Sequence, residues 1–119
     1  MKIAVTTSEK DLTSPVDERF GRAGGFIVFD TETGSHEFID NRQNMDAAQG
    51  AGIQSAKTVI DTGATVLITG NVGPKAYAAL AAGGVEIYLK NSGTVDNAII
   101  EYRSGSLVKT AGANVEGHW

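Results

Sequence analysis

Residues whose types could bind a ligand gather in the stretch "DERFGRAGGF" near the start of the chain. Arg19 and Arg22 flank Phe20 and Gly21, and two further glycines precede the next apolar run. Arginine presents a rigid fork of N–H donors to anions, and glycine lets a backbone approach a ligand closely. The stretch therefore predicts a site for an anionic, partly apolar object, with Phe20 and Ala23 contributing to an apolar floor.

Two other glycine-containing loops, "GNVGPK" (70–75) and "NSGT" (91–94), each follow a predicted buried strand and lead into a predicted helix. The start of a helix carries free amides and the positive end of the helix dipole, which together favour an anion. Lys75 adds a positive charge there, and Val72 extends the apolar floor. The candidate binding residues of these two loops are Asn71, Val72, Gly73, Lys75, Ser92, Gly93 and Thr94.

The elements that must position these loops follow from apolar patterning. Short β-branched runs predict strands, and apolar residues at helical spacing after residue 47 predict a first helix that ends at Gly63. Pro74 suits the first turn of a second helix, and Thr94 is a good N-cap for a third. The predicted strands are 2–7, 26–30, 36–40, 65–70 and 85–90, and the last two helices are 74–84 and 94–105.

The order of these elements predicts an α/β fold with three layers, α/β/α. Alternation of strands and helices after residue 47 favours parallel pairing, whereas 26–30 and 36–40 form an antiparallel hairpin at the edge. We expect a mixed five-stranded sheet in one domain, residues 1–119, with an irregular tail over 106–119. Ligands of open α/β sheets bind beyond the carboxyl ends of the parallel strands, where the candidate loops lie.

Composition narrows the classes of function. The chain has 119 residues, no cysteine and a net charge of −4, which argues against disulfides, thiolate ligands and broad nucleic-acid binding. No apolar run approaches the length of a membrane span, so a cytoplasmic location is expected. Glycine is the outlier, since 15 residues are nearly double the usual share of about 7%. No nucleophile elbow, P-loop or dinucleotide fingerprint stands in the required context, so a non-catalytic protein is expected.

Several stretches together carry a resemblance to a known family. "RFGRAGGF" after an N-terminal "KIAV" strand, "TGNVGPKAYAAL" followed by "AGGVEIY", and "SGTVDNAIIEYRSGSL" resemble the nitrogenase iron-molybdenum cofactor biosynthesis accessory family, over Met1 to about Leu107. The similarity is greatest to the orange protein branch, which holds a molybdenum-copper sulfide cluster. The resemblance implies a ribonuclease H-like fold and non-covalent carriage of a molybdenum-containing metal-sulfide cluster, of that type or the iron-molybdenum type. It also implies protein partners in a cytoplasmic complex.

Two positions bear on direct metal ligation. Many relatives carry a histidine just before the glycine that opens the first helix, and here Gln49 stands there. His118, next to the only tryptophan, is the candidate metal ligand, although neither it nor His36 forms a metal pair by spacing.

Each candidate also has an ordinary structural interpretation. The two arginines could pair with Asp17 and Glu18, Phe20 could fill the core, and the glycines could serve turns and caps. The sequence therefore leaves two functions open. The first is a carrier or assembly chaperone for the cluster, and the alternative is a regulatory or protein-interaction domain of the same fold with no bound cluster.

Overall fold

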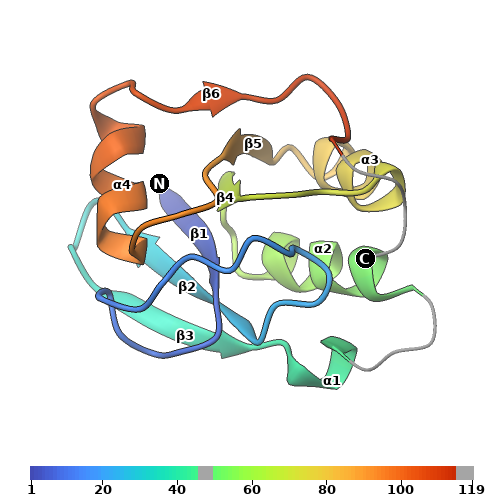
Figure 1. Cartoon of the computed structure of the whole chain (residues 1–119), viewed down its shortest axis with the longest axis horizontal. Coiled ribbons are helices and arrows are strands. Elements are labelled where there is room, and N and C mark those ends of the chain that lie inside the picture. Colours follow the sequence, from blue (N-terminus) through green and yellow to red (C-terminus); the bar gives the residue numbers. More distant parts are fainter. Residues whose placement is uncertain (46–49, 115–119) are drawn as a thin grey trace.

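The computed structural model describes residues 1–45 and 50–114, which form a mixed sheet covered by helices on both faces (Figure 1). Its strands lie in the order β3-β2-β1-β4-β5-β6. The strands are β1 (Lys2–Thr7), β2 (Gly25–Asp30), β3 (His36–Asp40), β4 (Val66–Thr69), β5 (Glu86–Leu89) and β6 (Val108–Lys109). The helices are α1 (Arg42–Met45), α2 (Ala51–Asp61), α3 (Pro74–Ala82) and α4 (Val95–Arg103).

The predicted pairing of the sheet is confirmed. β1, β4 and β5 are parallel neighbours, and β2 and β3 form the antiparallel hairpin beside β1. The prediction of five strands is wrong, because the described residues form six. β6 lies inside the range expected to be irregular and pairs antiparallel with the end of β5. A strand of two residues has no side-chain period, so only its tertiary contacts reveal it.

The three layers are also confirmed, with α2 and α3 on one face of the sheet and α4 on the other (Figure 1). Alternation along β1 divides the core: Ala4 packs toward α2 and α3, whereas Ile3 and Val5 pack toward α4. The ribonuclease H-like classification that the resemblance implies stays a prediction.

The helix boundaries follow local chemistry. Gly63 has a φ of 86°, which glycine adopts without strain, and donates its N–H to the carbonyl of Ile60 just beyond α2. Pro74 opens α3 and Thr94 caps α4, as the sequence predicted, and the structure adds a reciprocal capping box between Thr94 and Asn97. The first helix was expected from residue 47, but residues 46–49 lie outside the described residues, and α2 is described from Ala51. The single turn α1 was not anticipated. Among the described residues no helix combines the length and apolar character needed to cross a membrane.

Candidate functional site

The carboxyl ends of β1, β4 and β5 share one end of the sheet, which we call the carboxyl edge. The long loop 8–24 crosses this edge from the α4 side to the α2 side (Figure 1). Its backbone forms isolated bridges at Thr7–Val16, Pro15–Thr94 and Arg19–Asn71. Loop 8–24 is therefore an ordered segment attached to both neighbouring loops.

The bridges divide the candidate residues into two groups. Arg19–Ala23 lie beside Asn71, since the Phe20 amide donates to the Asn71 carbonyl at 3.2 Å. Ser92–Thr94 instead contact the first half of the loop, where the Val16 amide donates to the Gly93 carbonyl at 3.0 Å. The structure thus brings together the first two candidate stretches and attaches the third to a different part of the loop.

The start of α4 has its amides already bonded within the protein. The Val95 and Asp96 amides donate to the carbonyls of Ser14 and Leu12, at 2.9 and 2.8 Å. The Asn97 amide donates to the Thr94 side chain at 3.1 Å. Because these donors are engaged, this helix start has little left to offer an anion.

The starts of α2 and α3 are different. Both helices begin at the carboxyl edge, because each connects that edge to the opposite end of the sheet, and they pack against each other. Neither has a side-chain cap: Gly50 and Gly73 occupy the N-cap positions. Their dipoles therefore place two positive ends at the same edge, next to the Arg19–Ala23 segment.

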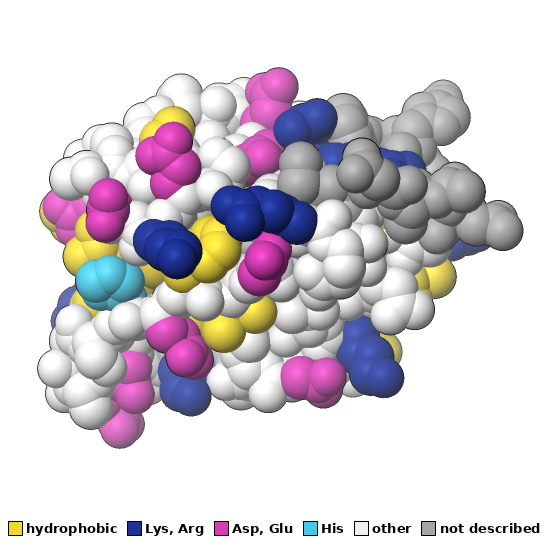
Figure 2. Space-filling model, turned by 90° about the horizontal axis from the view of Figure 1, so that it is seen from below, with side chains coloured by type: hydrophobic (Ala, Val, Ile, Leu, Met, Phe, Trp, Pro, Cys, Tyr) yellow, Lys and Arg dark blue, Asp and Glu magenta, His cyan; other side chains and the backbone are white. Residues whose placement is uncertain are grey.

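Positive side chains accompany these two helix starts. Arg19 and Lys75 are exposed, and Arg22 is half-buried. Arg19 also contacts Asp17: its amide donates to the Asp17 carboxylate at 2.9 Å, and its Nε lies 3.6 Å from the same oxygen. Figure 2, which views the molecule from the side of β3 and α1 at the bottom of Figure 1, shows Lys and Arg side chains in the middle of that face, with acidic groups among them. The ion pair foreseen for Arg19 is therefore present, in a setting that still exposes the guanidinium.

A buried polar network holds the arginine-containing loop against α2. The Asn41 side-chain amide donates to the carbonyl of Ala23 and to the Ser55 hydroxyl, both at 3.0 Å. The Ser55 hydroxyl lies 3.3 Å from the Gly21 carbonyl, and Asn44 donates to the Asn41 side-chain oxygen at 2.8 Å. Asn41 and Ser55 are fully buried. Sequence reasoning missed these residues, because single polar residues beside a helix carry no signal of where they bond.

A side chain from the tail, Asn114, fixes the loop after β4. The Asn114 side chain accepts a hydrogen bond from the Val72 amide at 2.7 Å and donates to the Gly70 carbonyl at 3.0 Å. Gly70 is required here, because a Cβ would lie 2.8 Å from the Cα of Glu18. Asn114 was also missed, since the tail has no pattern that predicts its contacts.

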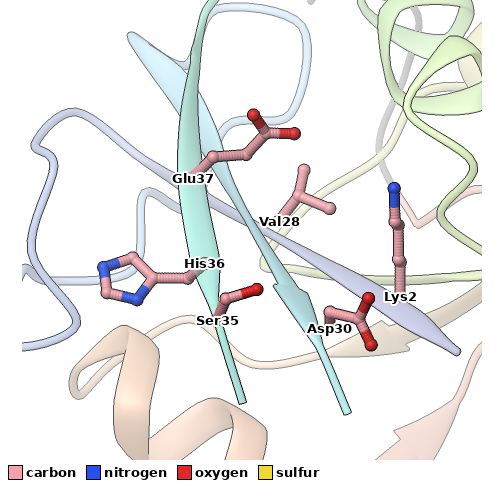
Figure 3. Close-up of a pocket in the computed structure, with 6 residues that line it drawn as sticks. All are labelled: Lys2, Val28, Asp30, Ser35, His36 and Glu37. Carbon is pink, nitrogen blue, oxygen red and sulfur yellow. The ribbon is translucent and has the colours of Figure 1, made fainter. Parts of the chain in front are cut away.

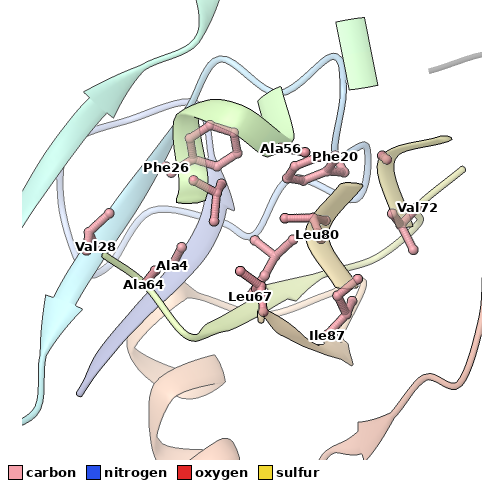
Figure 4. Packing of buried hydrophobic residues seen from close by; sticks show 13 residues of the cluster. Ala4, Phe20, Phe26, Val28, Ala56, Ala64, Leu67, Val72, Leu80 and Ile87 are labelled. Carbon is pink, nitrogen blue, oxygen red and sulfur yellow. The ribbon is translucent and has the colours of Figure 1, made fainter. Parts of the chain in front are cut away.

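The residues expected to form an apolar floor lie in the core. Phe20, Ala23 and Val72 are each 0% exposed, and the ring centroids of Phe20 and Phe26 are 5.7 Å apart (Figure 4). Their side chains therefore support the loops from below rather than presenting an open apolar surface. The core-filling interpretation of Phe20 agrees with this placement.

The residues considered as metal ligands do not form a metal site in the described part of the chain. In residues 1–45 and 50–114, no three histidine, aspartate or glutamate side chains gather where a metal ion could bind. Gln49 and His118 lie outside the described residues, and His36 lies on β3. A cavity of about 210 Å³ at the carboxyl edge is lined by Gly70, Asn71, Leu89, Lys90, Asn91 and Asn114.

Fold and site together define a small mixed α/β domain with two uncapped helix starts and exposed basic side chains at one edge. The chain belongs to the dinitrogenase iron-molybdenum cofactor family, whose model matches residues 1–105. It is similar to the apo form of the orange protein from Desulfovibrio gigas, with 41% identity, a TM-score of 0.93 and 96% of each chain covered.

Two further proteins resemble the chain over nearly its whole length. A putative NifB protein from Thermotoga is 36% identical, with a TM-score of 0.85 and 98% of each chain covered. An uncharacterized protein of Methanocaldococcus jannaschii is 32% identical, with 92% of this chain and 91% of the relative covered.

Proposed function

We propose that this protein is a non-covalent carrier or assembly chaperone for a molybdenum-containing metal-sulfide cluster. The cluster, of the molybdenum-copper or iron-molybdenum type, is its cargo. Membership of the dinitrogenase iron-molybdenum cofactor family supports a role in that cofactor's chemistry, and the similarity to the orange protein supports the same class of cargo.

The observation that carries the proposal is the pairing of the α2 and α3 starts beside Arg19–Ala23. Thiometallate clusters are polyanions, and the unpaired amides of a helix start attract negative charge. Two such starts without side-chain caps, accompanied by exposed Arg19 and Lys75, make an edge suited to an anion. Sulfur is a weak hydrogen-bond acceptor, so several donors acting together are needed to retain it.

The donor set explains why the binding would be non-covalent. The chain has no cysteine, so a cluster held here keeps its own inorganic sulfides and receives no thiolate from the protein. Arg19, Arg22 and Lys75 would balance its charge, while the amides of Gly21 and Gly73 and the Asn71 side chain lie in the segments that flank it. A carrier transfers its cargo without changing covalent bonds, so no catalytic residue is assigned, and proteins that donate or receive the cluster would be its partners.

Reconstitution tests this proposal. Purified protein is incubated with tetrathiomolybdate and a copper salt, gel-filtered, and measured for molybdenum, copper and visible absorption. We expect retained molybdenum and a charge-transfer band. Protein that emerges colourless and free of molybdenum would favour the alternative, a regulatory or protein-interaction domain without a cluster. Ser92–Thr94 and His118, the remaining candidates, can be tested in the same assay by substitution to alanine.

A further inference from the structure

The outer side of β3 is an unpaired sheet edge. β3 pairs with β2 on one side, and no strand among the described residues pairs with its other side. Proteins commonly protect such edges with lysine, proline or a bulge, because an open edge accepts another strand. β3 has the sequence "HEFID" and an uninterrupted register with β2, so it has no lysine, proline or bulge, and Glu37 and Asp40 are its two charged residues.

The hydrogen bonds at the two ends of the hairpin show which backbone groups are free. The Asp30 amide donates to the Ser35 carbonyl at 2.9 Å, and the Asn41 amide donates to the Gly24 carbonyl at 2.8 Å. In an antiparallel pair, bonded and non-bonded residue pairs alternate along the strand. Alternation from the Asp30–Ser35 pair and from the Gly24–Asn41 pair assigns the same residues to the bonded pairs. The odd-numbered residues of β3 therefore bond to β2.

The even-numbered residues His36, Phe38 and Asp40 therefore direct their N–H and C=O groups outward, and of these groups the Asp40 carbonyl accepts a hydrogen bond from the Gln43 side chain at 3.4 Å. Their side chains share one face, since Phe38 packs against the apolar cluster beside α4. Figure 3 shows the same alternation: the side chain of His36 points away from that of Glu37 and the neighbouring Lys2. Lys10, His36, Glu37, Phe38, Asp40 and Arg42 line an open hollow of about 510 Å³ along this strand.

We propose that the outer edge of β3 pairs antiparallel with β3 of a second copy of this chain, with Phe38 at the two-fold axis. His36 then lies opposite the partner subunit's Asp40, and Asp40 opposite the partner subunit's His36. Phe38 lies opposite the partner's Phe38. His36 and Phe38 each donate and accept one backbone hydrogen bond across the axis. The Asp40 amide also donates across it, and the Asp40 carbonyl is shared between the partner and the Gln43 side chain.

The complementarity of the side chains selects this register. Cross-strand neighbours of opposite charge or of matched aromatic character stabilise a pair, and like charges opposite each other destabilise it. A shift by two residues in one direction places His36 opposite the partner's Arg42. The opposite shift places His36 opposite the partner's Phe38 and leaves Asp40 opposite the partner's Gly34. Only the register centred on Phe38 places an imidazole opposite a carboxylate and one aromatic ring opposite the other.

The size of the pairing predicts a weak dimer. A five-residue strand buries an interface at the low end of the usual range, below about 1,200 Å². The dimer should therefore depend on concentration. Because the strands are antiparallel, the two carboxyl edges lie at opposite ends of the joined sheet. Pairing thus leaves both proposed cluster sites open. A test of the dimer is therefore independent of a test of the proposed function.

Sedimentation velocity from about 10 µM to about 1 mM measures the pairing in the unmodified protein and in charge variants. His36→Glu places two carboxylates opposite each other and should weaken dimerisation roughly five- to tenfold. The double variant His36→Glu/Asp40→Lys restores opposite charges and should recover the dimer. Asp61→Lys, an exposed site on α2, is the matched control and should leave dimerisation unchanged.

Amide hydrogen exchange by NMR locates the interface. The His36, Phe38 and Asp40 amides should gain protection as the concentration rises, whereas those of Glu37 and Ile39 should be protected throughout. The proposal is overturned by a monomer at the highest concentration, by a dimer whose outward amides exchange freely, or by a double variant that does not recover.

Discussion

The two sides of the carboxyl edge carry similar sequence signals and have different structures. On the α4 side, a glycine-containing loop leads into a helix whose first amides are bonded to Ser14, Leu12 and Thr94. On the α2–α3 side, two helices begin without side-chain caps beside exposed basic residues. A glycine loop before a helix therefore does not by itself predict an anion site, and we propose the site on the side where the helix starts have no side-chain cap.

The largest expected effect of a substitution falls on the α2–α3 side. Asn41→Ala removes the side chain that bonds the Ala23 carbonyl and the Ser55 hydroxyl, and it leaves buried polar groups without partners. We expect a loss of about 2 to 3 kcal/mol in the free energy of unfolding, together with poor retention of the cluster. Urea denaturation and the molybdenum content after gel filtration measure the two effects.

Asn97→Ala is the matched control for that experiment, since it removes an exposed asparagine from the capping box of α4. It should cost less than about 1 kcal/mol and leave retention intact. Equal retention in both variants would show that the buried network does not shape the site.

The second largest effect is expected for the two arginines, whose substitution should lower cluster retention more than the free energy of unfolding. Arg19→Ala and Arg22→Ala should each lower cluster retention roughly tenfold or more, because a hydrogen bond to a charged group is worth about 1.5 to 3 kcal/mol. In Arg19→Ala, at an exposed position, the free energy of unfolding should change by less than about 0.5 kcal/mol, as at most surface sites. Arg42→Ala, an exposed arginine beside β3, serves as the control. A marked loss of stability with intact retention would make the two arginines structural.

The third effect tests the α4 side directly. Thr94→Ala removes the hydroxyl that accepts the Asn97 amide, and loss of an N-cap costs about 1 kcal/mol. Cluster retention should stay unchanged, because the amides at this helix start bond to the protein. A retention loss comparable to that of Arg19→Ala would place the cargo on both sides of the edge.

The smallest effect is expected for Lys75→Ala, which should raise the stability of the protein and lower its retention of the cluster. Lys75 lies in the first turn of α3, where a positive charge opposes the helix dipole. Lys75→Ala should therefore raise the free energy of unfolding by about 0.3 to 0.5 kcal/mol while weakening retention a few-fold. Thermal melts and molybdenum analysis on the same preparation check both signs, and a stability loss would contradict the assigned position of the lysine.

Much of the fold could be predicted because its signals are local. The β-branched runs gave the long strands, and Pro74, Thr94 and Gly63 marked helix ends through their own backbone chemistry. β6 and α1 were missed because a two-residue strand and a single helical turn have no side-chain period. Their existence depends on what they pack against.

The site was predictable only in part, for the same reason. The sequence placed the glycine loops at one edge, but it could not show that loop 8–24 supplies carbonyls to α4 and leaves α2 and α3 uncapped. Asn41 and Asn114, which fix the two loops, act across 14 and 44 residues of sequence. Contacts at such separations leave no pattern in a single chain.

The central claim is that the cargo lies at the starts of α2 and α3. Chemical-shift mapping by NMR tests it directly, since a tetrathiomolybdate–copper(I) cluster is diamagnetic and can be titrated into isotope-labelled protein. We expect shifts for the amides of Gly21, Ala51, Lys75 and Ala76, with those of Val95, Asp96 and Asn97 unchanged. Shifts confined to the start of α4, or spread evenly over the surface, would contradict the assignment.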